Sequence, residues 1–110
     1  MTRIDAPCSS SPPGLGIGWR PELALPIERR RDLAFVEIIA ENIDPRSIPA
    51  PLVTLRDRGL QIIPHGVSLS LGGADPIDRD RVRRLADLAR QLGSPLVSEH
   101  IAFVRAGGIE

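Results

Sequence analysis

The sequence predicts an α/β domain built around a parallel β-sheet, and three observations support this. Short apolar runs rich in β-branched residues alternate with longer segments of helical periodicity, as strands joined by crossover helices do. Hydrophobic residues make up 42% of the 110 residues and charged residues 25%, which is enough to form an ordinary packed core. Polar residues follow the apolar runs, where parallel sheets carry their binding sites.

Four strands are expected along the chain. The run AFVEIIA is almost continuously apolar, which is typical of a parallel strand buried on both faces. The expected strands cover residues 15–19, 34–40, 60–64 and, with its following turn, 95–104.

Two short helices should connect the first three strands. The first extends over 21–32, where Pro21 suits a helix start and Pro26 must shorten, kink or split the helix. The second follows Ser47, which can act as its capping residue, and ends at Gly59.

The third helix, residues 78–92, has the strongest signal. Its apolar residues recur every three or four positions, Asp78 can cap its start, and Gly93 ends it. Four strands and three helices would leave two open sheet edges, through which the chain could self-associate.

Composition excludes several classes of function. Fourteen arginines balance fourteen acidic residues, so the chain has no general field for nucleic acid, and the absence of lysine excludes Schiff-base chemistry. We found no membrane-spanning run and no secretory signal, and we expect a cytoplasmic protein. Residues 1–13 are expected to form a flexible tail before a domain over 14–110.

Both histidines lie at expected strand ends. His65 and His100 are 35 residues apart, about one strand–helix unit, so their rings should meet on adjacent strands. Paired imidazoles bind several divalent metals without selecting one. The alternative is that each ring is only a hydrogen-bonded residue at a strand end.

Two glutamates near the second strand are a further candidate. Glu37 and Glu41 are four residues apart, and alternation would place both on the face of Phe35 and Ile39. A buried carboxylate needs a metal, an arginine or backbone N–H groups as a partner. Either a ligand role or a structural pair with arginine is consistent with this pattern.

Two glycine-containing segments are candidates for phosphate-binding loops. GVSLSLGG (66–73) could let its backbone approach a ligand closely, but it lacks the lysine of a P-loop and is also consistent with an ordinary connection. GLGIG (14–18) lacks the third glycine and the helix start of a dinucleotide fingerprint, so we reject that function.

Four segments together resemble the multinuclear non-heme iron-dependent oxidases, a family that includes the methanobactin and bufferin biosynthesis enzymes. The resemblance runs over residues 14–110. It is carried, in order and spacing, by GIGWRPEL (16–23), VEIIAEN (36–42), HGVSLSLGG (65–73) and SEHIAFVR (98–105).

This resemblance implies the N-terminal part of a xylose-isomerase-like TIM (β/α)8 barrel. It also implies a multinuclear non-heme iron centre that uses oxygen to modify cysteines of a ribosomally made precursor peptide, which a separate partner protein often presents. His65 and His100 match iron-binding histidines and would act only as ligands; we assign no catalytic residue. The residues expected to bind substrate or to support the ligands are Glu41, Asn42, Arg20 and Ser68.

The family's later ligand-bearing strands have no counterpart in the sequence, so we expect a truncated form that is inactive alone. Two alternatives stay open at this point. One is a sugar-isomerase-like or endonuclease-like barrel that uses another divalent metal. The other is a non-catalytic half-barrel that needs a partner chain.

Overall fold

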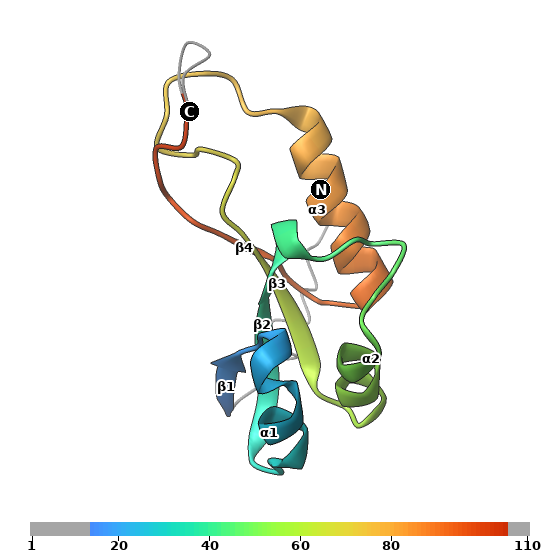
Figure 1. Ribbon diagram of the computed structural model, residues 1–110. Helices are drawn as coiled ribbons and strands as arrows, with labels where there is room; N and C mark the ends of the chain where they lie inside the picture. The colour runs from blue at the N-terminus through green and yellow to red at the C-terminus, as the bar shows by residue number, and fades with distance from the viewer. Residues whose placement is uncertain (1–13, 106–110) are drawn as a thin grey trace, which may run out of the picture.

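A computed structural model describes residues 14–105 and shows a half-barrel of four parallel strands in the order β1-β2-β3-β4 with three α-helices (Figure 1). The predicted α/β class is therefore confirmed, while the expected tail over 1–13 lies outside the described residues. In chain order the elements are β1 Leu15–Gly18, 3-10 helix η2 Pro21–Leu23, α1 Ala24–Arg29, β2 Leu33–Ile39, 3-10 helix η3 Ala40–Asn42, α2 Ala50–Asp57, β3 Gln61–Gly66, α3 Arg79–Leu92 and β4 Ser98–Glu99.

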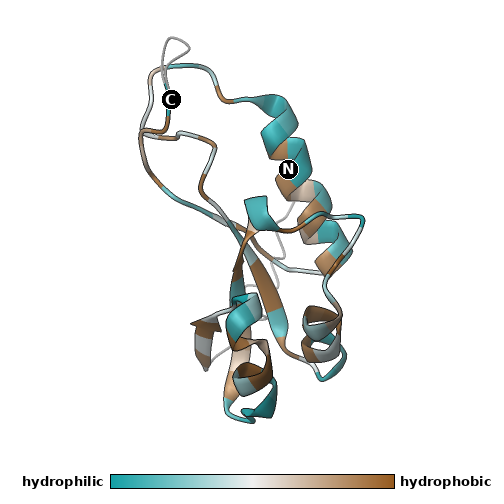
Figure 2. Cartoon of the chain, in the orientation of Figure 1, coloured by the Kyte–Doolittle hydropathy of each residue, from teal (hydrophilic) through white to brown (hydrophobic). Residues whose placement is uncertain are grey.

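The core lies between one face of the sheet and the three helices. Alternation along β2 and β3 directs Val36, Ile38 and Ile62 to this face, and each is at most 1% exposed. They belong to one apolar cluster with α2 and α3, to which Leu52, Leu55, Leu88 and Leu92 also contribute. Figure 2 shows the division along α3, with hydrophobic residues on one side and hydrophilic residues on the other.

The opposite face of the sheet is the interior of the half-barrel. It carries Phe35, Glu37 and Ile39 of β2 and His65 of β3, all of them half-buried. Gly16 pairs with Phe35, and a Cβ at Gly16 would lie 2.1 Å from the Phe35 ring. Glycine is therefore needed in β1 because the ring crosses the strand.

The first connection is split, as the prolines predicted. Pro21 begins η2, and α1 starts separately at Ala24. Pro26 is the third residue of α1, where a backbone N–H would have no partner within the helix, so the ring costs no hydrogen bond.

The predicted cap of the second helix is wrong, whereas the third helix is confirmed. Pro49, not Ser47, precedes the first residue of α2, and no side chain caps that end in the described structure. In α3 the Asp78 carboxylate accepts hydrogen bonds from the N–H groups of Asp80 and Arg81, and Gly93 ends the helix with φ 63°.

The fourth strand is much shorter than the predicted 95–104. Only Ser98–Glu99 pairs with β3, because after the His100 N–H, which donates to the Gly66 carbonyl, the chain bonds to the loop after β3. Gly72 donates to the Ala102 carbonyl at 2.9 Å, and the Val104 N–H donates to Ser70 Oγ at 2.9 Å. Ser70 has φ 58° and is 7% exposed, so this contact holds a residue in a left-handed conformation.

Within residues 14–105, no helix combines the length and the apolar character that a membrane crossing requires.

Candidate functional site

The two histidines lie together at the carboxyl end of the sheet. His65 is the penultimate residue of β3, and His100 directly follows β4. Their ring centres are 6.2 Å apart and the ring planes make an angle of 72°. The proximity predicted from strand ends 35 residues apart is confirmed, whereas the metal-binding role stays a prediction.

The His65 ring is held from the neighbouring strand. Its Nδ1 and the hydroxyl of Ser98 share a hydrogen bond of 2.8 Å, across a pair of residues in register. This contact occupies one ring nitrogen and leaves Nε2 for a ligand. His100 is exposed on its side chain, but its backbone N–H donates to the Gly66 carbonyl at 2.8 Å.

The spacing of the two rings is compatible with binding to a metal ion. The centre of a metal-bound imidazole lies about 3.2 Å from the ion, so rings 6.2 Å apart can reach one ion from nearly opposite sides or two neighbouring ions. A ligand histidine usually bonds through its other nitrogen to a supporting group, which Ser98 supplies to His65. Among residues 14–105, no third His, Cys, Asp or Glu joins this pair in a group that could hold a metal ion.

Glu41 is not where alternation placed it. β2 ends at Ile39, and Glu41 lies in η3, so it does not share a strand face with Glu37. The turn into the 3-10 helix breaks the two-residue period of the strand. Glu37 stays within β2, in register with Ile63 and half-buried.

The Glu41 carboxylate holds the loop that follows β3. It accepts the Val67 N–H at 3.1 Å on each oxygen, and Oε2 accepts the Ser68 hydroxyl at 2.5 Å. Partial burial raises the pKa of this carboxyl, but the hydrogen bonds from Ser68 and Val67 outweigh it and leave the pKa below its usual value. Among residues 14–105, backbone N–H and hydroxyl groups therefore donate hydrogen bonds to this acid.

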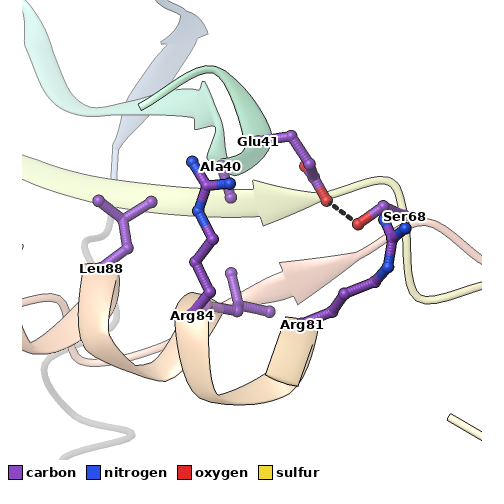
Figure 3. A pocket seen from close by; sticks show the side chains of 7 residues that line it. Ala40, Glu41, Ser68, Arg81, Arg84 and Leu88 are labelled. Carbon is purple, nitrogen blue, oxygen red and sulfur yellow. Dashed lines mark hydrogen bonds between the residues drawn. The ribbon is translucent and has the colours of Figure 1, made fainter. Parts of the chain in front are cut away.

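Glu41 and Ser68 also line a small cavity of about 70 Å³ against α3 (Figure 3). Arg81 and Arg84 approach from the helix, and Leu88 closes its apolar wall. This cavity lies between η3 and α3, on the helix side of the sheet.

Arg20 and Asn42 lie at the ends of the first two strands, as predicted. Both are exposed, and both line a cleft of about 540 Å³ together with Trp19 and Ile39. Trp19 is 5% exposed, and its Nε1–H has no hydrogen-bond partner among the described residues. The cleft opens at the ends of β1 and β2, on the same carboxyl edge of the sheet where β3 and β4 carry the histidines.

Sequence reasoning missed Glu99. Alternation directs it away from the His65 face, and the structure agrees, because its side chain lies against Gly66 on the other side of the strand pair. Its Oε1 accepts the Leu69 N–H at 2.9 Å, whereas its Oε2 is buried with no hydrogen-bond partner among residues 14–105. The signal available in the sequence was an acidic residue directly before a candidate ligand, on a strand next to one that ends in glycine.

Comparison with known proteins identifies the family. Residues 14–110 match the family model described as RiPP precursor modification enzyme MbnB/TglH/ChrH. The chain is 58% identical over 95 residues to a UPF0276 protein of Streptomyces avermitilis, covering 86% of this chain and 20% of that protein. It is 39% identical over 109 residues to a UPF0276 protein of Bordetella pertussis, covering 96% and 37%. A UPF0276 protein of Haemophilus influenzae is 33% identical over 101 residues, covering 86% and 32%.

The chain thus spans between a fifth and two fifths of the length of these relatives. The family match covers every residue of the site described above. The chain belongs to the family of RiPP precursor modification enzymes MbnB/TglH/ChrH.

Proposed function

We propose that this chain supplies two histidine ligands to the iron centre of an oxygen-dependent oxidase. The enzyme would modify cysteine residues of a ribosomally synthesised precursor peptide. The observation that carries this proposal is the His65–His100 pair, with ring centres 6.2 Å apart at the carboxyl end of a parallel sheet. Membership of a family of precursor-modifying enzymes supports a peptide as the substrate.

The roles of the residues follow from their contacts. His65 would bind through Nε2, because Nδ1 is shared with Ser98, and His100 would bind from the adjacent strand. The contacts of Glu41 with Val67 and Ser68 hold the loop that directly follows β3 and so would support the ligands. The remaining ligands would come from residues other than those described.

The cleft at the ends of β1 and β2 is the proposed peptide-contacting surface. Arg20 offers a guanidinium and Asn42 an amide at its rim, and both suit a peptide backbone or an acidic side chain. Ile39 supplies an apolar wall. We propose that a separate protein presents the precursor peptide to this rim.

Iron bound at the histidines would supply oxygen activation and a binding position for a substrate thiolate. The chain's own contribution is to orient the imidazoles and the peptide. A thiolate is the form of cysteine that binds metal, so substrate binding would release the thiol proton.

Anaerobic titration with Fe(II) tests the ligand assignment. We expect His65→Ala and His100→Ala each to weaken binding at least tenfold, because each removes one of two imidazoles from the site. Asp57→Ala, an exposed change at the end of α2, is the matched control. Unchanged iron binding in both histidine variants would contradict the assignment.

Competition among metals separates this proposal from the other metal-dependent barrels. The same titration with Zn(II) and Mn(II) should show that Fe(II) is the metal retained when the chain is purified anaerobically. Retention of zinc or manganese, together with turnover of a sugar or of abasic DNA, would favour an isomerase-like or endonuclease-like barrel instead.

A further inference from the structure

The pairing between β3 and β4 is too short to fix the two histidines by backbone bonds alone. β2 and β3 share five register pairs, whereas β3 and β4 share only His65 with Ser98 and Gly66 with Glu99. His100 lies beyond the last of these pairs and is exposed. Beyond these pairs, the bond from the His100 N–H to the Gly66 carbonyl at 2.8 Å joins the ends of β3 and β4, so side-chain contacts contribute to their placement.

Beyond the last register pair, side-chain carboxylates bind the loop that follows β3. The loop 67–69 leaves β3 directly after Gly66, and its three residues are each bound by a glutamate. From the end of β2, Glu41 accepts hydrogen bonds from Val67 N–H and from the Ser68 hydroxyl. From β4, Glu99 accepts the Leu69 N–H at 2.9 Å. The loop is thus held from both neighbouring strands at once.

The Glu99 carboxylate, which accepts the Leu69 N–H, packs closely against Gly66. Its carboxylate lies so close to Gly66 that a Cβ there would be 1.9 Å from Oε2, and Gly66 is itself buried. Within β4 and the residue after it, Glu99 lies between Ser98, which bonds the His65 ring, and His100. Its carboxylate thus binds the loop that follows His65, while its backbone is bonded to Ser98 and His100.

From these contacts we propose that Glu99 is a positioning residue that, with Glu41, fixes loop 67–69 and thereby the relative placement of the His65 and His100 rings. This inference rests on the proposed ligand role of the two histidines. Glu99 acts through the loop and through β4, and it takes no part as a ligand, because it faces the opposite side of the strand pair.

The test uses the metal-free chain and ¹⁵N NMR of the imidazole rings. In the wild type, the bond from Ser98 should give His65 one fixed tautomer, and the two rings should show contacts to each other. We expect Glu99→Ala to shift both histidines toward the averaged signals of free imidazole and to abolish the contacts between the rings. Asp57→Ala should leave the signals unchanged.

Two conservative variants keep the outcome decisive. Glu99→Gln retains an oxygen for the Leu69 N–H, so it should rescue the wild-type ring signals. Glu99→Asp keeps the charge but is one methylene too short to reach Leu69, so it should behave as Glu99→Ala does. If circular dichroism shows that the alanine variant does not fold, the ring signals of Glu99→Asp test the positioning role instead. Wild-type ring signals in a folded Glu99→Asp variant would overturn the proposal.

Fe(II) titration of the same samples separates this inference from the proposed function. We expect about tenfold weaker binding for Glu99→Ala and Glu99→Asp than for the wild type. If no sample binds iron, the ligand role fails, while the ring signals still decide whether Glu99 positions the histidines. If the wild type binds iron and both shortened variants match it in affinity and ring signals, only the positioning role fails.

Discussion

The helix-covered face of the sheet and the rim that carries the histidines are held by different forces. On the covered face, Val36, Ile38 and Ile62 are at most 1% exposed and sit within long parallel ladders. At the rim, the ends of β3 and β4 are held by two register pairs, the bond from the His100 N–H to the Gly66 carbonyl and a few side-chain hydrogen bonds. The comparison shows that burial determines the fold, whereas polar contacts determine the geometry of the site.

The largest loss of stability should come from a substitution in the core on the helix-covered face. Leu52 is fully buried in α2, so Leu52→Ala should lower the free energy of unfolding by about 2–5 kcal/mol through lost burial and a cavity. Urea denaturation measures the change. Leu25→Ala in α1, where the side chain is 54% exposed, should change stability by less than about 0.5 kcal/mol. Equal effects of the two variants would mean that the helices do not hold the sheet as described.

A smaller loss of stability is expected at Gly66, where the helix-covered face meets the histidine-bearing rim. A Cβ at Gly66 would collide with the Glu99 carboxylate, so Gly66→Ala should cost about 1–3 kcal/mol. It should also shift the ring signals of both histidines. At Gly18, which ends β1, a Cβ would meet open space, so Gly18→Ala is the matched control. A neutral Gly66→Ala variant would show that the carboxylate can leave its position freely.

The Glu41 carboxyl should make the rim sensitive to acid. Its pKa is lower in the folded chain than in the unfolded chain, so its contribution to stability is complete above the unfolded pKa. That contribution is lost as the pH falls through the folded pKa. We expect Glu41→Gln to flatten the pH dependence of urea stability in this acidic range. An identical slope in variant and wild type would contradict the assigned contacts.

Ser98 should matter more for geometry than for stability. Ser98→Ala removes the hydroxyl at His65 Nδ1, so it should cost about 0.5–1.5 kcal/mol and release the ring to exchange between tautomers. The histidine ¹⁵N signals report the tautomers directly. Ser94→Ala, whose hydroxyl donates only to the Leu96 carbonyl, is a control on a nearby connection. An unchanged tautomer in Ser98→Ala would show that another group orients His65.

The weakest effect concerns contacts between molecules. Ile101 and Phe103 follow β4 and are 81% and 64% exposed, beside a sheet edge that has no partner strand among residues 14–105. We propose weak self-association through this edge, which the double variant Ile101→Ser, Phe103→Ser should reduce. Light scattering over a concentration series measures it. A molar mass of the wild type that stays constant over the concentration series would contradict this proposal.

Prediction from sequence worked best where one local signal decided the outcome. Asp78 and Gly93 delimit α3 as expected, because a cap and a left-handed glycine act within one turn. The histidine pair was predictable because parallel strands bring their carboxyl ends to one edge. Ser47 failed as a cap because α2 begins at Ala50, which places Pro49 in the capping position. Glu41 failed as a strand residue because η3 interrupts the alternation.

The sequence by itself determined the parallel α/β class, the three helices and the neighbouring positions of His65 and His100, because these depend on periodicity and strand order. Tertiary structure decided the short β4, the contacts of Glu41 with Val67 and Ser68, and the place of Glu99 beneath the loop. These features join residues that are some 26 to 35 positions apart, through hydrogen bonds whose partners no local pattern specifies.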